Sequence, residues 1–90
     1  MSNRYWLDLP DEVEAEIAKT PNRVRPQIKR EIADLRDNPR PAHAKAMRNY
    51  PDRYRITIDD HRIYYRVDDE ALIVHLLKVG KKHGPEFYQP

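Results

Sequence analysis

The chain has 90 residues, of which 39% are hydrophobic and 36% are charged. This length accommodates one small domain, so residues 1–90 are expected to form a single unit with a modest core beneath a highly ionised surface. The absence of cysteine excludes disulfides and thiolate chemistry and is typical of a reducing cytoplasm. The sequence also lacks an apolar run of about 18 residues and the apolar core of a signal peptide, which favours a soluble cytoplasmic protein.

The formal net charge of +2 conceals a segregation of charge along the chain. Acidic residues predominate from Asp8 to Glu16, whereas the segment from Arg48 to Arg66 carries five arginines and three aspartates. Because local charge attracts partners more directly than net charge does, this central segment is predicted to form a phosphate-facing surface.

The chain begins with a predicted strand and a short helix. Residues 4–9 are rich in aromatic and apolar side chains that favour strands, and Pro10 follows them. Val13 and Ile17 then lie four positions apart in an acidic segment, which predicts a short helix that ends near Pro21.

A second helix is predicted from a longer apolar stripe. Its members recur with the period of one helix face and are Val24, Ile28, Ile32 and Leu35. Pro26 is tolerated in the first turn of this helix, where its missing N–H costs little. The turn-forming residues 37–41 end the helix and begin a loop that is expected to continue to about Arg48.

The second half of the chain predicts three strands. Residues 53–58 and 61–67 alternate between apolar and polar side chains and are separated by a tight turn at Asp59 and Asp60. Residues 71–79 are apolar on both faces, as in a central strand. The order strand, helix, helix, strand, strand, strand predicts an α+β fold, in which a helical hairpin packs on a mostly antiparallel, four-stranded sheet.

The tight turn also predicts how the hairpin pairs. Three cross-strand pairs share one face of the sheet and are Arg53 with Arg66, Arg55 with Tyr64, and Thr57 with Arg62. We call these six residues the arginine face. The helices can cover only the opposite, apolar face, so the arginine face is expected to be uncovered. Its four arginines repel one another unless an anion or acidic partner compensates them; the alternative is a solvated surface whose arginine stems cover apolar groups.

The second half of the chain resembles toxins of the RelE family, in the RelE/ParE superfamily of bacterial toxin–antitoxin systems. The motifs that carry the resemblance are Tyr54-Arg55-Ile56, Arg62-Ile63-Tyr64-Tyr65, Val79-Gly80-Lys81-Lys82, and Tyr88 at the expected distance. The first half is similar in order and length, with a strand YWLDL, two helices and the segment AMRNYPDRY. The resemblance therefore covers nearly the whole chain.

This resemblance implies a metal-free ribonuclease that cuts messenger RNA in the ribosomal A site and that a cognate antitoxin neutralises. The positions that match the family's functional residues are Arg55, Arg62, Lys82 and Tyr88. Two positions depart from the family pattern. Thr57 stands where well-known members have a second strand lysine implicated in proton transfer, and Lys82 replaces an arginine, which keeps the cation but loses the bidentate fork.

Metal-free RNA cleavage requires a base for the attacking 2′-OH, an acid for the leaving 5′-oxygen and cations for the charge that develops on the phosphate. Arg55 and Arg62 stay protonated and are assigned to phosphate clamping. Lys82 is a further cation and a candidate for proton transfer. His83 is a candidate to replace the group absent at Thr57, or else an exposed bystander.

Tyr88 is predicted to stack on a base or to donate a proton, and its alternative role is a hydrophobic anchor. Gly80 and Gly84 are predicted hinges that bring Lys82 and Tyr88 over the arginine face. The three lysines around the end of the last strand can approach the same face. The predicted RNA-binding residues are Arg48, Arg53, Tyr64, Arg66, Lys78 and Lys81. Among these, Tyr64 offers a flat ring for stacking against a base.

The four histidines do not predict a metal site. His43, His61, His75 and His83 lack the close spacing of metal ligands, and no cofactor is expected. His61 and His75 are interpreted as structural. The face that His75 occupies depends on the length of the turn before the last strand.

Two other functions are compatible with the same residues. One is a ParE-like toxin that inhibits DNA gyrase without cutting RNA, and the other is a toxin weakened by Thr57 and retained as an antitoxin-binding domain. The expected partners are mRNA, ribosomal RNA and a cognate antitoxin with an acidic or amphipathic segment, in a hetero-oligomer.

Overall fold

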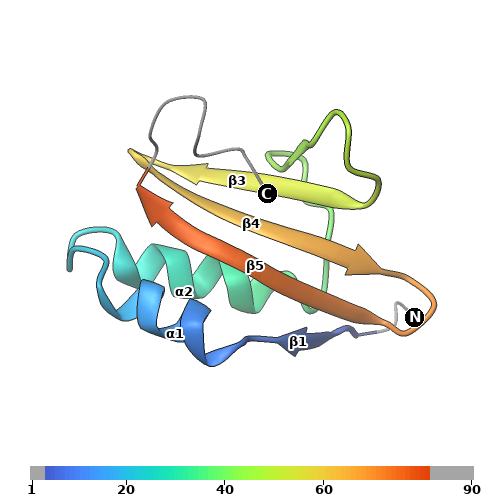
Figure 1. Ribbon diagram of the computed structural model, residues 1–90, viewed down its shortest axis with the longest axis horizontal. Coiled ribbons are helices and arrows are strands. Elements are labelled where there is room, and N and C mark those ends of the chain that lie inside the picture. The colour runs from blue at the N-terminus through green and yellow to red at the C-terminus, as the bar shows by residue number, and fades with distance from the viewer. Residues whose placement is uncertain (1–3, 82–90) are drawn as a thin grey trace.

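The computed structural model describes residues 4–81. The helices and strands of this part are β1 Trp6–Asp8, α1 Asp11–Ala18, α2 Arg25–Asp34, β2 Lys45–Ala46, β3 Arg53–Ile58, β4 His61–Asp68 and β5 Ile73–Lys81. The strands form one sheet in the order β1-β5-β4-β3-β2, in which β1 and β5 are parallel and the other pairs are antiparallel. Both helices lie on the same side of this sheet (Figure 1). The predicted α+β fold is therefore confirmed. Neither helix of the described part is long and apolar enough to cross a membrane.

The sheet has one strand more than the sequence predicts. β2 lies in the segment that was expected to be a loop, and it pairs with Tyr54 and Arg55 of β3. Two residues are too few to show an alternating pattern, so hydrophobic periodicity does not reveal this strand.

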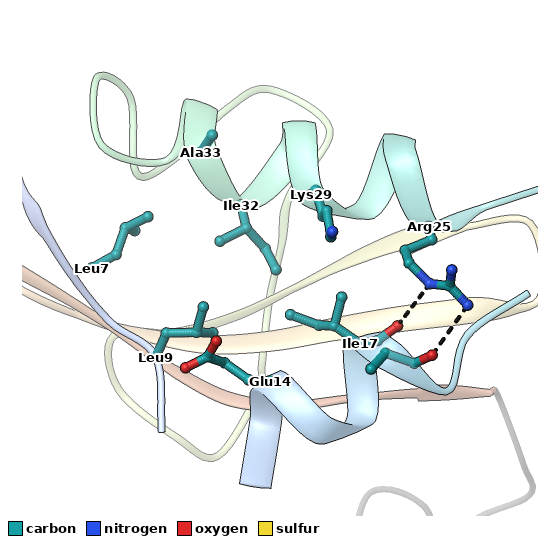
Figure 2. A pocket seen from close by; sticks show the side chains of 9 residues that line it. Leu7, Leu9, Glu14, Ile17, Arg25, Lys29, Ile32 and Ala33 are labelled. Carbon is teal, nitrogen blue, oxygen red and sulfur yellow. Dashed lines mark hydrogen bonds between the residues drawn. The ribbon is translucent and has the colours of Figure 1, made fainter. Parts of the chain in front are cut away.

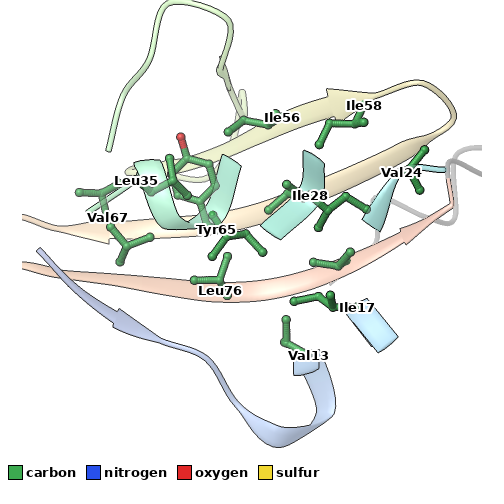
Figure 3. Packing of buried hydrophobic residues seen from close by; sticks show 14 residues of the cluster. Val13, Ile17, Val24, Ile28, Leu35, Ile56, Ile58, Tyr65, Val67 and Leu76 are labelled. Carbon is green, nitrogen blue, oxygen red and sulfur yellow. The ribbon is translucent and has the colours of Figure 1, made fainter. Parts of the chain in front are cut away.

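The core lies between the helices and the sheet (Figure 3). The apolar face of the hairpin contributes Ile56, Ile63 and Tyr65, whose exposed fraction is 0%. The helices contribute the predicted stripes, which are Val13, Ile17, Val24, Ile28, Ile32 and Leu35. Each fully buried aliphatic side chain stabilises the fold by about 1.5–3 kcal/mol of transfer free energy. Burial also raises the pKa of Tyr65, whose hydroxyl donates a 2.8 Å hydrogen bond to the Pro39 carbonyl oxygen.

A bulge in β5 decides which of its side chains leave the core. Tyr64 pairs with Lys78 whereas the next residue, Tyr65, pairs with Leu76, so Leu77 is one residue extra in β5. Such a bulge lets two successive side chains point to the same face. Leu77 is consequently 39% exposed. The prediction that both faces of this strand are covered is therefore wrong at Leu77.

α1 caps the edge of β5 that β1 leaves open. β1 pairs with β5 along residues 73–75, and the chain then turns into α1. The Glu16 carboxylate of α1 accepts a 2.9 Å hydrogen bond from the backbone N–H of Val79 and a 3.3 Å hydrogen bond from Lys78 Nζ. A side chain thus satisfies a backbone donor that a neighbouring strand would otherwise pair.

Arg40 ties the loop after α2 to a distant end of the sheet. Its guanidinium donates to both carboxylate oxygens of Asp69, at 3.1 and 2.8 Å, and to the Tyr54 hydroxyl at 2.8 Å. Tyr5 donates a 2.7 Å hydrogen bond to the same carboxylate. The hydrogen bonds from Arg40 and Tyr5 lower the pKa of Asp69. They join the loop, the start of the chain and the turn between β4 and β5.

Arg25, the first residue of α2, closes the C-terminal end of α1. The last turn of α1 has no basic side chain of its own. The Arg25 guanidinium donates to the carbonyl oxygens of Ile17 at 3.3 Å and Ala18 at 3.1 Å (Figure 2), and also to that of Thr20. Carbonyl groups at a helix C-terminus lack partners within the helix and carry partial negative charge, so a cation stabilises them.

Replacement of Arg25 tests this cap. Arg25→Ala is expected to lower the free energy of unfolding by about 1–2 kcal/mol, because three carbonyl groups lose a charged donor. Arg25→Lys should lose less, since it keeps the charge. Urea unfolding followed by circular dichroism measures both. The exposed Arg30 of the same helix is the control. Equal losses in Arg25→Ala and Arg30→Ala would contradict the capping role.

Candidate functional site

The hairpin of β3 and β4 has the predicted register. The pairs of the arginine face are present as Arg53 with Arg66, Arg55 with Tyr64, and Thr57 with Arg62. Ile58 pairs with His61 across the turn. Within the turn Asp59 has a φ of 52°, which aspartate tolerates better than most residues. The arginine face therefore forms on the side of the sheet away from the helices.

The neighbouring strands extend each pair into a row across the sheet. The turn row contains Thr57, Arg62 and Gly80. The central row contains Lys45, Arg55, Tyr64 and Lys78. The distal row contains Arg53, Arg66, His75 and Asp8. Within a row, side chains directly opposite each other have Cβ atoms about 4.5–5.5 Å apart. Successive rows are two residues apart along each strand, so the three rows form one surface.

The arginine face is less open than predicted. Arg62 and Tyr64 are only 7% and 5% exposed, whereas the rest of the face is exposed or half-buried. Both belong to β4, which is paired with a strand on each side. Arg62 Nη1 donates a 3.5 Å hydrogen bond to the Tyr64 hydroxyl. The prediction of an uncovered patch is therefore wrong for these two residues, and burial instead holds Arg62 in a defined position.

Two of the predicted RNA-binding lysines lie differently from the expectation. Lys78 belongs to the central row by register, but its Nζ extends to Glu16 of α1, 3.3 Å away. Lys81 pairs with His61, and its Nζ lies 3.9 Å from Asp60 Oδ2. Gly80 lies on the arginine face, and successive side chains of a strand point to opposite faces. Lys81 therefore points to the helical side of the sheet. The prediction that Lys81 approaches the arginine face is therefore wrong.

The structure shows which face of the sheet carries His75. It occupies the distal row, and its Nδ1 is 2.7 Å from Asp8 Oδ2. Asp8 thus places a carboxylate at one end of this row. His61 is on the other side of the sheet, 5% exposed, with Nδ1 2.8 Å from Asp60 Oδ1. Among residues 4–81, no three potential histidine or carboxylate ligands gather as a metal site would require.

Several predicted residues lie elsewhere or beyond the described part. Lys82, His83, Gly84 and Tyr88 fall outside residues 4–81. Arg48 is exposed in the turn before β3, and the Arg53 guanidinium lies 5.0 Å from the centre of the Tyr50 ring.

Gly80, a predicted hinge, is instead an ordinary member of β5. It pairs with Arg62, and it has no positive φ. The hinge interpretation of Gly80 is therefore wrong. What distinguishes this position is the absence of a side chain directly opposite Arg62.

Lys45 is a member of the site that the sequence did not identify. It is exposed, and its pairing with Arg55 adds a cation to the outer end of the central row. A single lysine between two alanines carries no recognisable signal. Its place in the site depends entirely on the pairing of β2 with β3.

An apolar groove of about 570 Å³ lies on the opposite side of the sheet, between α1, α2 and the end of β1. Figure 2 shows Leu7, Leu9 and Ile32 around this space, with Lys29 on α2 above it. The groove offers hydrophobic contact rather than a set of anion ligands, and it shares no residue with the arginine face.

Arg55 and Arg62 can bind and polarise a phosphate, but neither they nor Thr57 is suited to proton transfer. Arg55 and Arg62 lie on adjacent strands in adjacent rows, and guanidinium groups remain charged at neutral pH. A phosphate between them can therefore accept hydrogen bonds from both. Thr57 is exposed opposite Arg62, yet a hydroxyl is a poor general base.

These features define a small α+β protein with a cationic sheet face, and comparison with known proteins assigns its family. The model of the ParE toxin of type II toxin–antitoxin system, parDE, matches residues 3–84. The mRNA interferase toxin RelE of Escherichia coli (strain K12) is 33% identical over 86 residues, which span 93% of this chain and 90% of that protein. The chain belongs to the RelE/ParE family of type II toxin–antitoxin toxins.

Solved structures agree with this assignment. The isolated E. coli RelE toxin superposes with a TM-score of 0.76 at 32% identity, over 93% of this chain and 90% of that one. The toxin in the intact E. coli RelBE toxin–antitoxin complex superposes with a TM-score of 0.75 at 31% identity, over 88% of this chain and 98% of that one. The fold and the sequence therefore indicate the same family.

Substitution of Gly80 tests whether RNA approaches the sheet at the position opposite Arg62. Gly80→Val is expected to weaken the binding of a short single-stranded RNA about tenfold, because the new side chain lies opposite Arg62. The fold should be retained, since valine favours strands. Fluorescence anisotropy measures the affinity, and Leu77→Val is the control on the same face. Unchanged affinity in a folded Gly80→Val variant would contradict an approach of RNA at this position.

Proposed function

We propose that this chain is the toxin of a type II toxin–antitoxin system and cleaves messenger RNA in a ribosome-dependent reaction. The observation that supports this function best is the arrangement of Arg55 and Arg62 in adjacent rows of one cationic surface. The family supplies the second support, because the E. coli relative is named mRNA interferase toxin RelE.

The proposed reaction is an attack of the ribose 2′-oxygen on the adjacent phosphorus, with departure of the 5′-oxygen. The 2′-OH loses its proton to a base, and the 5′-oxygen receives one from an acid, so the products are a 2′,3′-cyclic phosphate and a 5′-hydroxyl. Arg55 and Arg62 stabilise the negative charge that grows on the non-bridging oxygens. Lys82, His83 and Tyr88 are the proposed groups for proton transfer or base stacking, and no metal ion has a role in this scheme.

The outer parts of the arginine face are proposed to hold the rest of the RNA. Lys45, Arg53 and Arg66 are placed to contact phosphates, and Arg48 extends this surface beyond β3. Such contacts are electrostatic, so binding should weaken as salt increases. Their lack of base specificity is consistent with a requirement for the ribosome to present the message.

The proposed regulator is a cognate antitoxin with an acidic or amphipathic segment. The E. coli relative has been solved with its antitoxin as the RelBE complex. Charge complementarity favours an acidic segment on the arginine face, where it would compete with RNA. Because ribosomes translate messenger RNA in the cytoplasm, this is the proposed location of the activity.

Replacement of Arg62 tests the assignment. Arg62→Ala is expected to reduce cleavage of mRNA on purified ribosomes by about 100-fold, because the phosphate loses a preorganised guanidinium. Gel analysis of a labelled message measures the rate. Arg30→Ala on α2 is the control for loss of one positive charge.

Arg62 is buried, so the state of the variant must be established separately. Circular dichroism and binding of the antitoxin report whether Arg62→Ala is folded. A folded variant that cleaves at the rate of the wild-type chain would sink the proposed role of the arginine face.

Inhibition of DNA gyrase is the second candidate function. It is favoured by one observation, that the matching family model is described as ParE toxin. A supercoiling assay with purified gyrase separates the two functions. Inhibition of supercoiling without cleavage of translated mRNA would replace the proposed activity with this alternative.

A further inference from the structure

The turn that leads into β3 brings an aromatic ring and a guanidinium together. Residues 50–53 read Tyr-Pro-Asp-Arg, and the backbone N–H of Arg53 donates a 3.2 Å hydrogen bond to the Tyr50 carbonyl oxygen. Proline at the second position and a positive φ at the third, 64° at Asp52, are features of a type II β-turn. Because a β-turn brings its first and fourth Cα atoms within about 7 Å, the side chains of Tyr50 and Arg53 can meet.

These two side chains form a cation–π pair. The central carbon of the Arg53 guanidinium lies over the Tyr50 ring, 5.0 Å from its centre. Both residues are half-buried, so part of the pair remains open to solvent. A flat ring beside a flat cation is a surface on which a nucleobase stacks, because the π-face of a base packs well against both groups.

Backbone hydrogen bonds hold this turn in place before any ligand binds. The Tyr50 N–H donates a 3.3 Å hydrogen bond to the Met47 carbonyl oxygen, and the Met47 N–H donates a 2.9 Å hydrogen bond to that of Arg53. The Asp52 carbonyl oxygen accepts a 2.9 Å hydrogen bond from the N–H of Val67 in β4. The pair is therefore preorganised, which lowers the entropic cost of binding a ligand.

The charges around the pair favour an anionic ligand. Arg53 lies opposite Arg66 in the distal row, and like charges in such a position repel each other. The nearby carboxylates of Asp52 and Asp69 lie against Arg40 instead, 3.9 and 2.8 Å from its Nη2. Among residues 4–81, no ion pair joins Arg53 or Arg66 to a carboxylate. A phosphate between the two arginines would relieve their repulsion.

We propose that Tyr50 and Arg53 form a stacking site for one nucleobase of single-stranded RNA, with a phosphate of that RNA between Arg53 and Arg66. The distal row is two residues, or about 7 Å, from the central row that contains Arg55. The base therefore belongs to a nucleotide next to the phosphate held by Arg55 and Arg62. The choice of RNA as the ligand rests on the proposed function, and the sequence did not identify Tyr50 as part of the site.

Stacking and ionic contact respond differently to substitution. Tyr50→Leu removes the ring without a change of charge, so it is expected to weaken binding of a short single-stranded RNA about tenfold and to leave the salt dependence unchanged. Tyr50→Phe keeps the ring and should remain within about twofold of the wild-type affinity. Arg53→Gln removes a phosphate contact, so the slope of log affinity against log salt should become shallower by about 0.7. Fluorescence anisotropy measures all three.

Trp6 supplies a matched control. It is a 72% exposed aromatic residue in β1, and β1 and β2 form opposite edges of the sheet. Trp6→Leu should therefore leave the affinity for RNA within about twofold of the wild-type value. The hydrogen bonds that hold the turn use the backbone of Tyr50 and not its side chain, so Tyr50→Leu is expected to fold, and thermal unfolding checks this.

Fluorescence reports stacking directly, because Trp6 is the only tryptophan of the chain. Tyr50→Trp combined with Trp6→Phe places the single indole in the proposed site. Short single-stranded RNA is expected to quench this indole, since a stacked base quenches indole emission, and to leave Trp6 of the wild-type chain unquenched. Inorganic tripolyphosphate, a polyanion without a base, should not quench it. Equal quenching by RNA and tripolyphosphate would show an ionic contact without stacking and would overturn the inference.

Purified ribosomes show which RNA supplies the base. Because the site lies one row from Arg55, the base is expected to come from the message, so Tyr50→Leu should weaken binding to ribosomes only when they carry a message. Equal weakening on ribosomes without a message would assign the base to ribosomal RNA and overturn its place beside the clamped phosphate.

The outcomes also separate this inference from the proposed function. An affinity of Tyr50→Leu equal to that of the wild-type chain, or a loss matched by Trp6→Leu, overturns the stacking site and leaves the proposed function intact. Failure of the wild-type chain to bind the short RNA also overturns the stacking site. Binding and quenching as expected, without cleavage of mRNA on ribosomes, support the stacking site and overturn the proposed function.

Discussion

The two-residue turn between β3 and β4 is the constraint on which the rest of this structure depends. It pairs Ile58 with His61, and this pairing sets the phase of every side chain in the hairpin. A slip of one residue would turn the isoleucines to solvent and the arginines into the core. Because a charge buried without partners costs several kcal/mol, the observed register is strongly preferred. The same pairing thus specifies both the hydrophobic core and the cationic surface.

The charges around this surface are not distributed evenly. Carboxylates of Asp8 and Glu16 lie beside His75 and Lys78, at the border with β1 and α1. Lys45 lies at the opposite border, on β2. Positive charge is therefore concentrated toward β3, β2 and the turn, where Arg62 is held by burial. A polyanion is expected to follow that side of the sheet.

Sequence patterns predicted the parts of this molecule that repeat with a regular period. The helix stripes, the hairpin register and the arginine face all follow from such periods. β2 was missed because two residues show no period, and Lys45 was missed with it. Lys81 was predicted on the wrong face of the sheet. The bulge at Leu77 changes which residues of β5 point to each face, and the sequence pattern does not reveal this bulge. The burial of Arg62 was missed, because alternation along a strand predicts the face of a side chain and not how far it is covered.

We propose that this cationic sheet face cleaves messenger RNA during translation. Primer extension on a reporter mRNA after induction of the chain tests it most directly, with a second reporter that lacks its start codon. We expect cuts within codons of the translated reporter and an intact untranslated reporter. Equal cleavage of both reporters would contradict dependence on the ribosome, and an intact translated reporter would contradict the cleavage itself.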